Sequence, residues 1–106
     1  MMKEVTVEEM KSMIDNNEVF QLVDVRENYE YDIANLGGEL IPLATVPFNI
    51  DKISRENKTI IHCKSGARSA AAIQLLEKNF GFTNLYNLKG GILAWADRID
   101  SSVVKY

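Results

Sequence analysis

The sequence is short of the residue types on which several common functions depend. It contains one cysteine, one histidine and one tryptophan in 106 residues. A single cysteine excludes an intrachain disulfide and a redox thiol pair, and it excludes a multi-cysteine zinc site, so we expect no metal. Whatever chemistry the thiol of Cys63 performs, it performs without a second thiol in the chain.

Basic charge and long apolar runs are also scarce. The formal net charge is −3, which is unsuited to nucleic acid because phosphate contacts require a basic face. Polar residues interrupt the apolar stretches well before membrane-spanning length, and Met1–Glu4 lacks the apolar region of a signal peptide. We therefore expect a cytoplasmic protein with neither nucleic acid nor membrane as a partner.

The rest of the composition is that of an ordinary folded domain. Hydrophobic residues make up 46% and charged residues 25% of the chain. A chain of this length can bury roughly two thirds of its unfolded surface in one core. The sequence has no internal repeat, low-complexity tract or linker, so we expect a single domain over residues 1–106.

Hydrophobic patterning predicts strands that alternate with helices. Strands are predicted before residue 6 and at 19–25, 39–41, 58–62 and 84–88. Helices are predicted after Thr6, weakly at 27–33, from Arg68 to Gly81, and after Gly90. The chain beyond Asp100 is expected to form an extended surface strap. This alternation implies an α/β domain with a mainly parallel central sheet flanked by helices.

Two helical segments carry more detailed predictions. Thr6 followed by Glu9 forms a capping box, and Val7, Met10 and Ile14 are expected to form the buried face of the helix that follows. The spacing of Phe48, Ile50 and Ile53 predicts one irregular helical turn that packs inward.

Cys63 lies between the predicted strand 58–62 and the helix that follows it. In an open α/β sheet, ligands bind beyond the carboxyl ends of the strands. A loop at a helix N-terminus directs several backbone N–H groups at one small volume, and the helix dipole adds a partial positive charge there. These features stabilise a thiolate, so we expect Cys63 to be a nucleophile. The alternative is a small buried hydrophobic residue.

The residues around Cys63 supply groups that can hold an anion, including a persulfide. Positive charge, hydroxyl donors and a flexible backbone come from Lys64, Ser65, Gly66, Ala67, Arg68 and Ser69. A positive charge in the first turn of a helix opposes the helix dipole. This placement of Arg68 indicates a ligand-facing role, with a solvated surface residue as the alternative.

Three blocks of the sequence resemble the rhodanese family, and they occur in the family's order. The blocks are Leu22–Glu27, Cys63–Ser69 and Leu88–Trp95. The resemblance covers most of the chain and implies a three-layer, rhodanese-like domain with no cofactor. It also implies a sulfurtransferase in which Cys63 takes a sulfane sulfur from thiosulfate or a persulfide donor. The enzyme persulfide then passes the sulfur to a thiol, cyanide or a protein acceptor.

The resemblance assigns supporting roles to three further residues. Asp24 and Arg26 would stabilise and flank the active loop, and Trp95 would pack beneath it. The alternatives are a strand-end ion pair and a core aromatic residue. His62 precedes Cys63, but strand alternation directs adjacent side chains to opposite faces. We therefore expect a packed or partly exposed histidine rather than a catalytic partner.

Two other functions remain open at this point. Dual-specificity phosphatases and arsenate reductases share the cysteine and arginine, but four residues separate Cys63 from Arg68, one fewer than in those families. By the family rule, the shorter loop favours sulfur transfer over phosphoryl transfer. The third possibility is a non-catalytic docking module that uses the same fold as an interaction surface.

One segment departs from the pattern of many rhodanese-family members. Asn35–Glu39 stands in place of a His-Ile-Pro-Gly-Ala stretch, and Ile41–Leu43 follows. This variant resembles rhodanese domains fused to the adenylyltransferases that activate sulfur-carrier proteins for molybdopterin or thiamine synthesis. The resemblance implies a sulfur-carrier protein as one possible acceptor.

Overall fold

The strands of the central sheet all run parallel. The computed structural model describes residues 2–106, and within this part the five strands are ordered β1-β5-β4-β2-β3. The strands are β1 (Glu4–Val5), β2 (Gln21–Asp24), β3 (Glu39–Leu40), β4 (Thr59–His62) and β5 (Leu85–Leu88). The predicted α/β fold with a mainly parallel sheet is confirmed.

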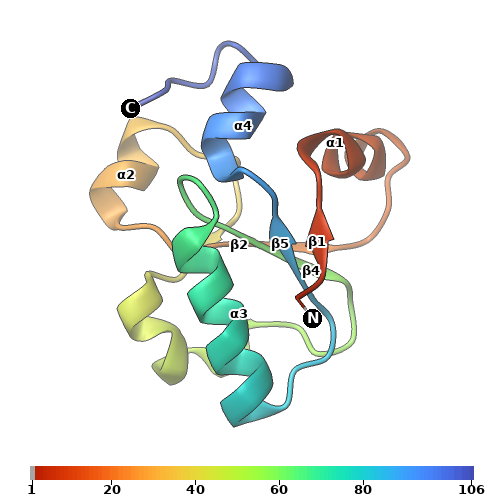
Figure 1. Cartoon of the computed structure of the whole chain (residues 1–106), viewed down its shortest axis with the longest axis vertical. Coiled ribbons are helices and arrows are strands. Elements are labelled where there is room, and N and C mark those ends of the chain that lie inside the picture. Colours follow the sequence, from red (N-terminus) through yellow and green to blue (C-terminus); the bar gives the residue numbers. More distant parts are fainter. Residues whose placement is uncertain (1) are drawn as a thin grey trace.

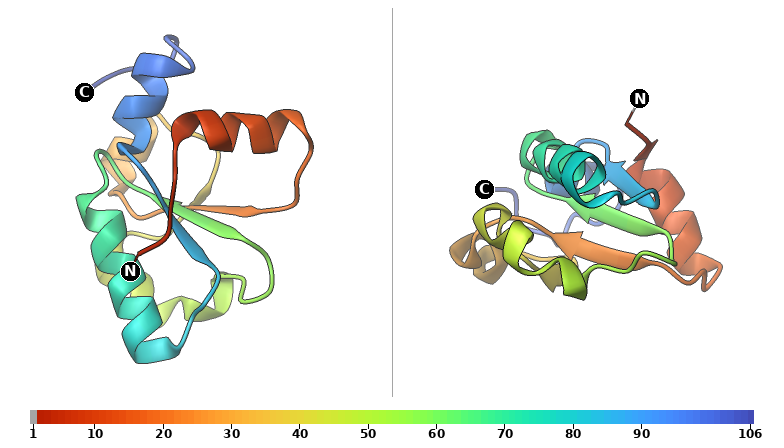
Figure 2. Two further views of the ribbon diagram at one scale, coloured as in Figure 1. Left: turned by 45° about the vertical axis from the view of Figure 1, so that its right-hand side comes forward. Right: turned by 90° about the horizontal axis from the view of Figure 1, so that it is seen from below.

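Helices cover both faces of this sheet. They are α1 (Val7–Asp15), α2 (Asn28–Ile33), α3 (Ala67–Phe80), α4 (Gly91–Arg98) and the 3-10 helices η1 (Leu43–Phe48) and η2 (Ile50–Lys52). Figure 1 and Figure 2 show α3 and the two 3-10 helices on one side of the sheet and α1 with α4 on the other. The predicted three-layer arrangement is confirmed. Within residues 2–106, no helix is both long and apolar enough to cross a bilayer.

Alternating side chains of β4 enter two separate cores. Ile61 faces α3 and packs with Val23, Ile73 and Leu76. Ile60 faces the opposite side and belongs to the cluster that α1 and α4 close. Both isoleucines are fully buried, and each such side chain contributes about 1.5–3 kcal/mol to folding. The two cores hold β4 at the centre of the sheet, so the residue that follows it is rigidly placed.

The first helix begins as its sequence predicts but buries a different set of residues. The Glu9 amide donates to Thr6 Oγ1 at 3.0 Å and the Thr6 amide donates to Glu9 Oε1 at 2.8 Å, which confirms the capping box. The buried residues of α1 are Val7, Met10 and Met13. Ile14 is 44% exposed, so its predicted burial is wrong. It lines an open groove near the end of the helix.

Two apolar residues predicted to pack inward are exposed instead. Phe48 is 83% exposed because η1 is a 3-10 helix, in which residues three apart share a face. Val46 is the buried residue of that helix, and Phe48 lies two positions further on, away from the core. Val19 is 78% exposed because β2 begins only at Gln21, so the predicted strand 19–25 is too long at its start.

Candidate active site

Cys63 lies at the carboxyl edge of the sheet, directly after the central strand β4. The register pairs Asp24 of β2 with His62 of β4, so both strands end at the same level. The helix α3 begins four residues later, with Gly66 as its N-cap at φ +116°. A side chain would strain this backbone conformation, so the sharp turn between Cys63 and α3 depends on glycine.

The sulfur of Cys63 is buried but has polar neighbours. The side chain is 1% exposed, the Gly66 amide donates to Sγ at 3.1 Å, and Ser69 Oγ lies 3.4 Å from Sγ. Burial acts to raise the pKa of the Cys63 thiol, but hydrogen bonds from the Ser69 hydroxyl and from loop amides outweigh it. The pKa therefore lies below its ordinary value. A buried hydrophobic role accounts for the low exposure of Cys63 but not for the amide aimed at its sulfur.

The N-terminus of α4 holds the other side of the loop. The Ile92 amide donates to Cys63 O at 3.0 Å and the Leu93 amide donates to Lys64 O at 3.2 Å. A Cβ atom on Gly91 would lie 2.6 Å from Cys63 O and closer still to Lys64 O. Only glycine therefore permits this contact. These two hydrogen bonds hold the backbone of Cys63 and Lys64 at the start of the loop.

Arg68 is engaged by a carboxylate rather than free to meet a ligand. Its guanidinium donates to Glu30 Oε1 at 2.6 Å and to Oε2 at 2.9 Å, while Glu30 of α2 is 2% exposed. The hydrogen bonds from Arg68 lower the pKa of Glu30 to about 2, against the opposing effect of burial. The pair neutralises the positive charge at the end of the loop and ties α3 to α2.

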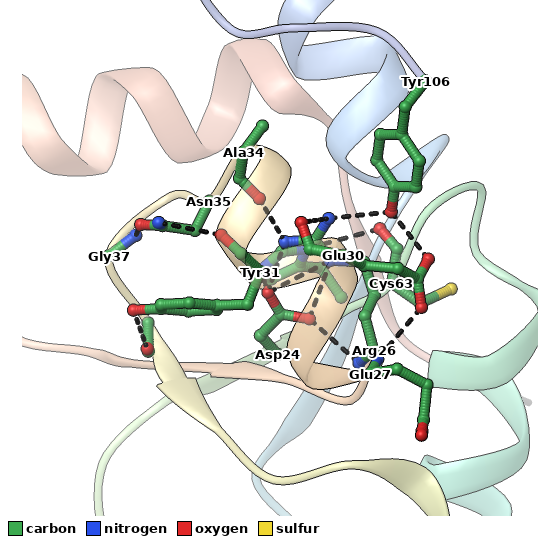
Figure 3. A network of polar contacts seen from close by, with 12 residues as sticks. Asp24, Arg26, Glu27, Glu30, Tyr31, Ala34, Asn35, Gly37, Cys63 and Tyr106 are labelled. Atoms are coloured by element: carbon green, nitrogen blue, oxygen red, sulfur yellow. Dashed lines mark hydrogen bonds and ion pairs between the residues drawn. The ribbon is translucent and has the colours of Figure 1, made fainter.

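The last residue of the chain joins the same network, which Figure 3 draws. Arg26 Nη1 donates to the Tyr106 hydroxyl at 2.7 Å, and this hydroxyl donates to Glu30 Oε2 at 2.7 Å. The Lys64 ammonium lies 4.5 Å from the centre of the Tyr106 ring, a cation–π contact. Tyr106 is thus in contact with both Lys64 and the partner of Arg68, which the prediction of a plain surface strap did not include.

Asp24 and Arg26 form a fully buried ion pair at the end of β2. The guanidinium donates to both carboxylate oxygens, with distances of 2.8–3.1 Å. A further hydrogen bond reaches Ala34 O at 2.7 Å. The pair reaches the active loop indirectly, through Tyr106 and Glu30, so its contacts are those of a strand-end support.

His62 is fully buried, as expected of a packed histidine. Burial lowers its pKa, although the carboxylate of Asp24, 3.6 Å from Nε2, acts in the opposite direction. A neutral side chain follows. Its Nδ1 lies 3.4 Å from Cys63 O, a contact with the backbone and not with the sulfur.

The remaining predicted residues divide between the loop surface and the opposite core. Ser65 and Ala67 are exposed, and Lys64 is half-buried. Trp95 packs with Met10, Ile60 and other members of the second cluster, whereas Cys63 belongs to the first. Trp95 also lines a groove of about 620 Å³ that does not include Cys63. These contacts are those of the core-aromatic alternative for Trp95.

Three residues of this site were absent from the sequence prediction. Glu30 and Tyr106 hold the outer side of the loop, and Asn87 contacts its inner side through Ser69. A signal existed for Asn87, since it is a polar residue inside an apolar strand. The acidic pair Glu27 and Glu30, spaced as a capping box, was a weaker signal. Nothing in the sequence pointed to Tyr106.

Comparison with known proteins identifies the family. The family model described as Rhodanese-like domain matches residues 6–98. Over 105 residues the chain is 32% identical to the probable adenylyltransferase/sulfurtransferase MoeZ of Mycobacterium tuberculosis, covering 96% of this chain and 26% of MoeZ. It therefore spans about a quarter of the length of that relative. The predicted similarity to rhodanese domains joined to adenylyltransferases is confirmed.

Two further relatives are similar to this chain over nearly their whole length. A protein named Sulfurtransferase from Allochromatium vinosum is 32% identical over 97 residues, covering 91% of this chain and 90% of that protein. The crystal structure of a rhodanese-like domain protein from Staphylococcus aureus superposes with a TM-score of 0.83 at 31% identity and covers 99% of both chains. With a matching family model, matching relatives and a shared fold, this chain belongs to the rhodanese-like domain family.

Proposed function

We propose that the protein is a sulfurtransferase that carries the transferred sulfur on Cys63 as a persulfide. The observation that carries this proposal is the Gly66 amide, which lies 3.1 Å from Cys63 Sγ in a loop that ends at a helix N-terminus. Such a loop stabilises negative charge on sulfur, whether that of a thiolate or that of a bound persulfide. Relatives named sulfurtransferases support the same class of reaction.

The reaction is a double displacement. The Cys63 thiolate attacks the sulfane sulfur of the donor, a new S–S bond forms, and the donor's own S–S bond breaks. With thiosulfate the leaving group is sulfite. A thiol or cyanide then attacks the outer sulfur of the persulfide, which regenerates the Cys63 thiolate. No cofactor takes part, and both steps need only the sulfur and the donors around it.

Loop length favours sulfur transfer over the phosphatase alternative. Four residues separate Cys63 from Arg68, one fewer than in the phosphatases and arsenate reductases that share the cysteine and arginine. A sulfur-carrier protein is a proposed acceptor, because Asn35–Glu39 resembles rhodanese domains that serve such carriers and because MoeZ is similar over most of this chain.

Intact mass spectrometry tests the proposal. The purified protein is incubated with thiosulfate, or with a low-molecular-weight persulfide such as that of glutathione, and then with cyanide. We expect one added sulfur atom per chain, removed by cyanide with the release of thiocyanate. Because the sequence has one cysteine, the adduct has a single possible thiol site.

The control variant is Cys63→Ser, which should keep the fold and form no adduct. The absence of an adduct in the unmodified protein with both donors would refute the proposal. Turnover of an aryl phosphate without a sulfur adduct would replace it with the phosphatase alternative. Retention of cellular function by the Cys63→Ser protein would favour a docking module.

A further inference from the structure

Asn87 is a buried polar residue in a strand whose other inward residues are apolar. It lies in β5 opposite Ile61 of β4 and is 5% exposed. Its side chain is not used for strand pairing but reaches the Cys63 loop. Nδ2 donates to Gly66 O at 3.2 Å, and Oδ1 accepts from Ser69 Oγ at 2.6 Å. One amide therefore holds both the N-cap of α3 and its first turn.

The chemistry of the two contacts fixes the orientation of this amide. A carbonyl oxygen only accepts hydrogen bonds, so the NH₂ group of Asn87 must face Gly66 O. The Asn87 Oδ1 atom then faces Ser69, and it too can only accept. The Ser69 hydroxyl has two oxygen acceptors within reach, Asn87 Oδ1 at 2.6 Å and Gly66 O at 3.1 Å. The contact with Asn87 is the shorter one, so we place the Ser69 proton along the line between Oγ and Oδ1.

Cys63 competes with Asn87 Oδ1 and Gly66 O for that one proton. Ser69 Oγ also lies 3.4 Å from Cys63 Sγ, close enough for a hydrogen bond to sulfur in either direction. When Ser69 donates to Asn87 it can only accept from Cys63, which must then be an S–H thiol. A thiolate gains the hydroxyl only when the proton turns toward Sγ, and the buried Asn87 Oδ1 then loses its donor.

We propose that Asn87 is a positioning residue that holds the Ser69 proton away from Cys63, so that the resting protein keeps a hydrogen-bonded thiol. We call the arrangement of Cys63, Ser69 and Asn87 the hydroxyl relay; its role in sulfur transfer rests on the function proposed above. Once the thiol proton has left to solvent, the Ser69 hydroxyl turns and donates to the negative sulfur. Asn87 thereby sets the pH at which Cys63 becomes nucleophilic.

The pH dependence of Cys63 alkylation by iodoacetamide measures this directly, because only the thiolate reacts. In Asn87→Ala the nearest acceptor of the Ser69 proton is removed and only Gly66 O, at 3.1 Å, still competes with the sulfur. We expect the apparent pKa of Cys63 to fall by about one pH unit. Below both pKa values, alkylation should then be roughly tenfold faster than in the unmodified protein at the same pH. In Asn87→Asp a stronger, charged acceptor holds the proton, and the pKa should rise.

A double-mutant cycle separates this relay from a loss of packing. Ser69→Ala should raise the Cys63 pKa in both backgrounds, because the Ser69 hydroxyl stabilises the thiolate. The rise should be larger in the Asn87→Ala background, at about one pH unit. A loosened loop would instead lose its amide donors, and Asn87→Ala would then raise the pKa. The matched control is Asn84→Ala, which removes hydrogen bonds to Ser54 O and Asn57 O of 2.6 Å each and should leave the Cys63 pKa unchanged.

A measurement on the unmodified protein does not depend on variant folding. The S–H stretching band in the infrared spectrum belongs to Cys63 alone, since there is no other thiol. We expect the band of a hydrogen-bonded S–H group at low frequency, moving to higher frequency in Ser69→Ala. An unshifted band, or a Cys63 pKa that does not fall in Asn87→Ala, overturns the inference. These readouts need no sulfur donor, so a protein that shows them but forms no persulfide refutes the proposed function and leaves the relay standing.

Discussion

Removal of the Glu30 carboxylate should destabilise the fold in a pH-dependent way. Glu30 is 2% exposed and accepts two hydrogen bonds from Arg68 and one from Tyr106. The substitution Glu30→Gln keeps the size of the side chain but removes its negative charge. Arg68 then loses its ion-pair partner at the end of the active loop, and α2 loses its charged contact with α3.

The lowered pKa of Glu30 gives the size of the effect. The pKa falls from 4.5 to about 2, a difference of about 2.5 pH units, which corresponds to roughly 3 kcal/mol. The Arg68 side chain is 34% exposed, so water screens one end of the pair and reduces this value. We expect Glu30→Gln to lower the free energy of unfolding by about 1–2 kcal/mol at pH 7.

The sign of the pH dependence follows from the direction of the shift. A carboxyl whose pKa is lower in the folded state stabilises the fold above its unfolded pKa, and this stabilisation is lost as the pH falls through the folded pKa. The difference in the free energy of unfolding between the unmodified protein and Glu30→Gln should therefore be constant from pH 7 to about pH 5. It should shrink by roughly half at pH 3. Protonation of Glu30 in the unmodified protein removes the same charge that the substitution removes.

Urea unfolding followed by the fluorescence of Trp95, the single tryptophan, measures both the loss of stability at pH 7 and its dependence on pH. Asp97→Asn is the control, because it breaks the exposed pair of Asp97 with Lys105 and should change stability very little. An equal difference at pH 7 and pH 3 would mean that Glu30 acts through packing and not through charge. The absence of any loss at pH 7 would refute the assigned ion pair.

Three other substitutions test single features of the site. Gly91→Ala places a Cβ within 2.6 Å of Cys63 O at φ +61°, so we expect a loss of about 2–4 kcal/mol in urea unfolding and slower Cys63 alkylation at pH 7; unchanged alkylation would contradict the role of α4. Asp24→Asn leaves the charge of Arg26 buried without its carboxylate and should cost about 3–5 kcal/mol by the same assay, a loss that an exposed pair would not produce. Tyr106→Phe keeps the ring beside Lys64 but removes two hydrogen bonds of 2.7 Å. A thermal melt should report a loss of about 1–2 kcal/mol in the free energy of unfolding. An unchanged melt would show that the hydroxyl does not make these hydrogen bonds in solution.

The layers of the fold followed from sequence periodicity because each strand has a clear apolar pattern. The strand before Cys63 was predicted at 58–62 and is observed as Thr59–His62, buried on both faces. Errors arose where an element ends. Ile14 and Phe48 have the spacing of a buried helical face, but both are exposed. Whether such a residue is covered depends on segments distant in sequence.

The sequence located the loop but not the residues that govern it. Local features mark Cys63 and Gly66, since they lie between a strand and a helix and the turn itself requires glycine. Glu30 contacts Arg68 of the loop across 38 residues of sequence, and Tyr106 contacts Glu30 across 76 residues. No periodic pattern encodes such contacts, which arise only when the folded sheet brings distant segments to one edge.

Two polar networks meet at the first turn of α3, and they act on different properties of the same sulfur. Ser69 belongs to the inner network, in which one proton is shared between the thiol side and Asn87. Arg68 belongs to the outer network, in which its charge is balanced by Glu30. Arg68 and Ser69 are consecutive residues. An anionic sulfur donor that drew Arg68 away from Glu30 would therefore displace the same helical turn that carries the Ser69 hydroxyl. The fold thus places the Arg68–Glu30 ion pair outside the loop directly beside the Ser69 hydroxyl that contacts the sulfur within it.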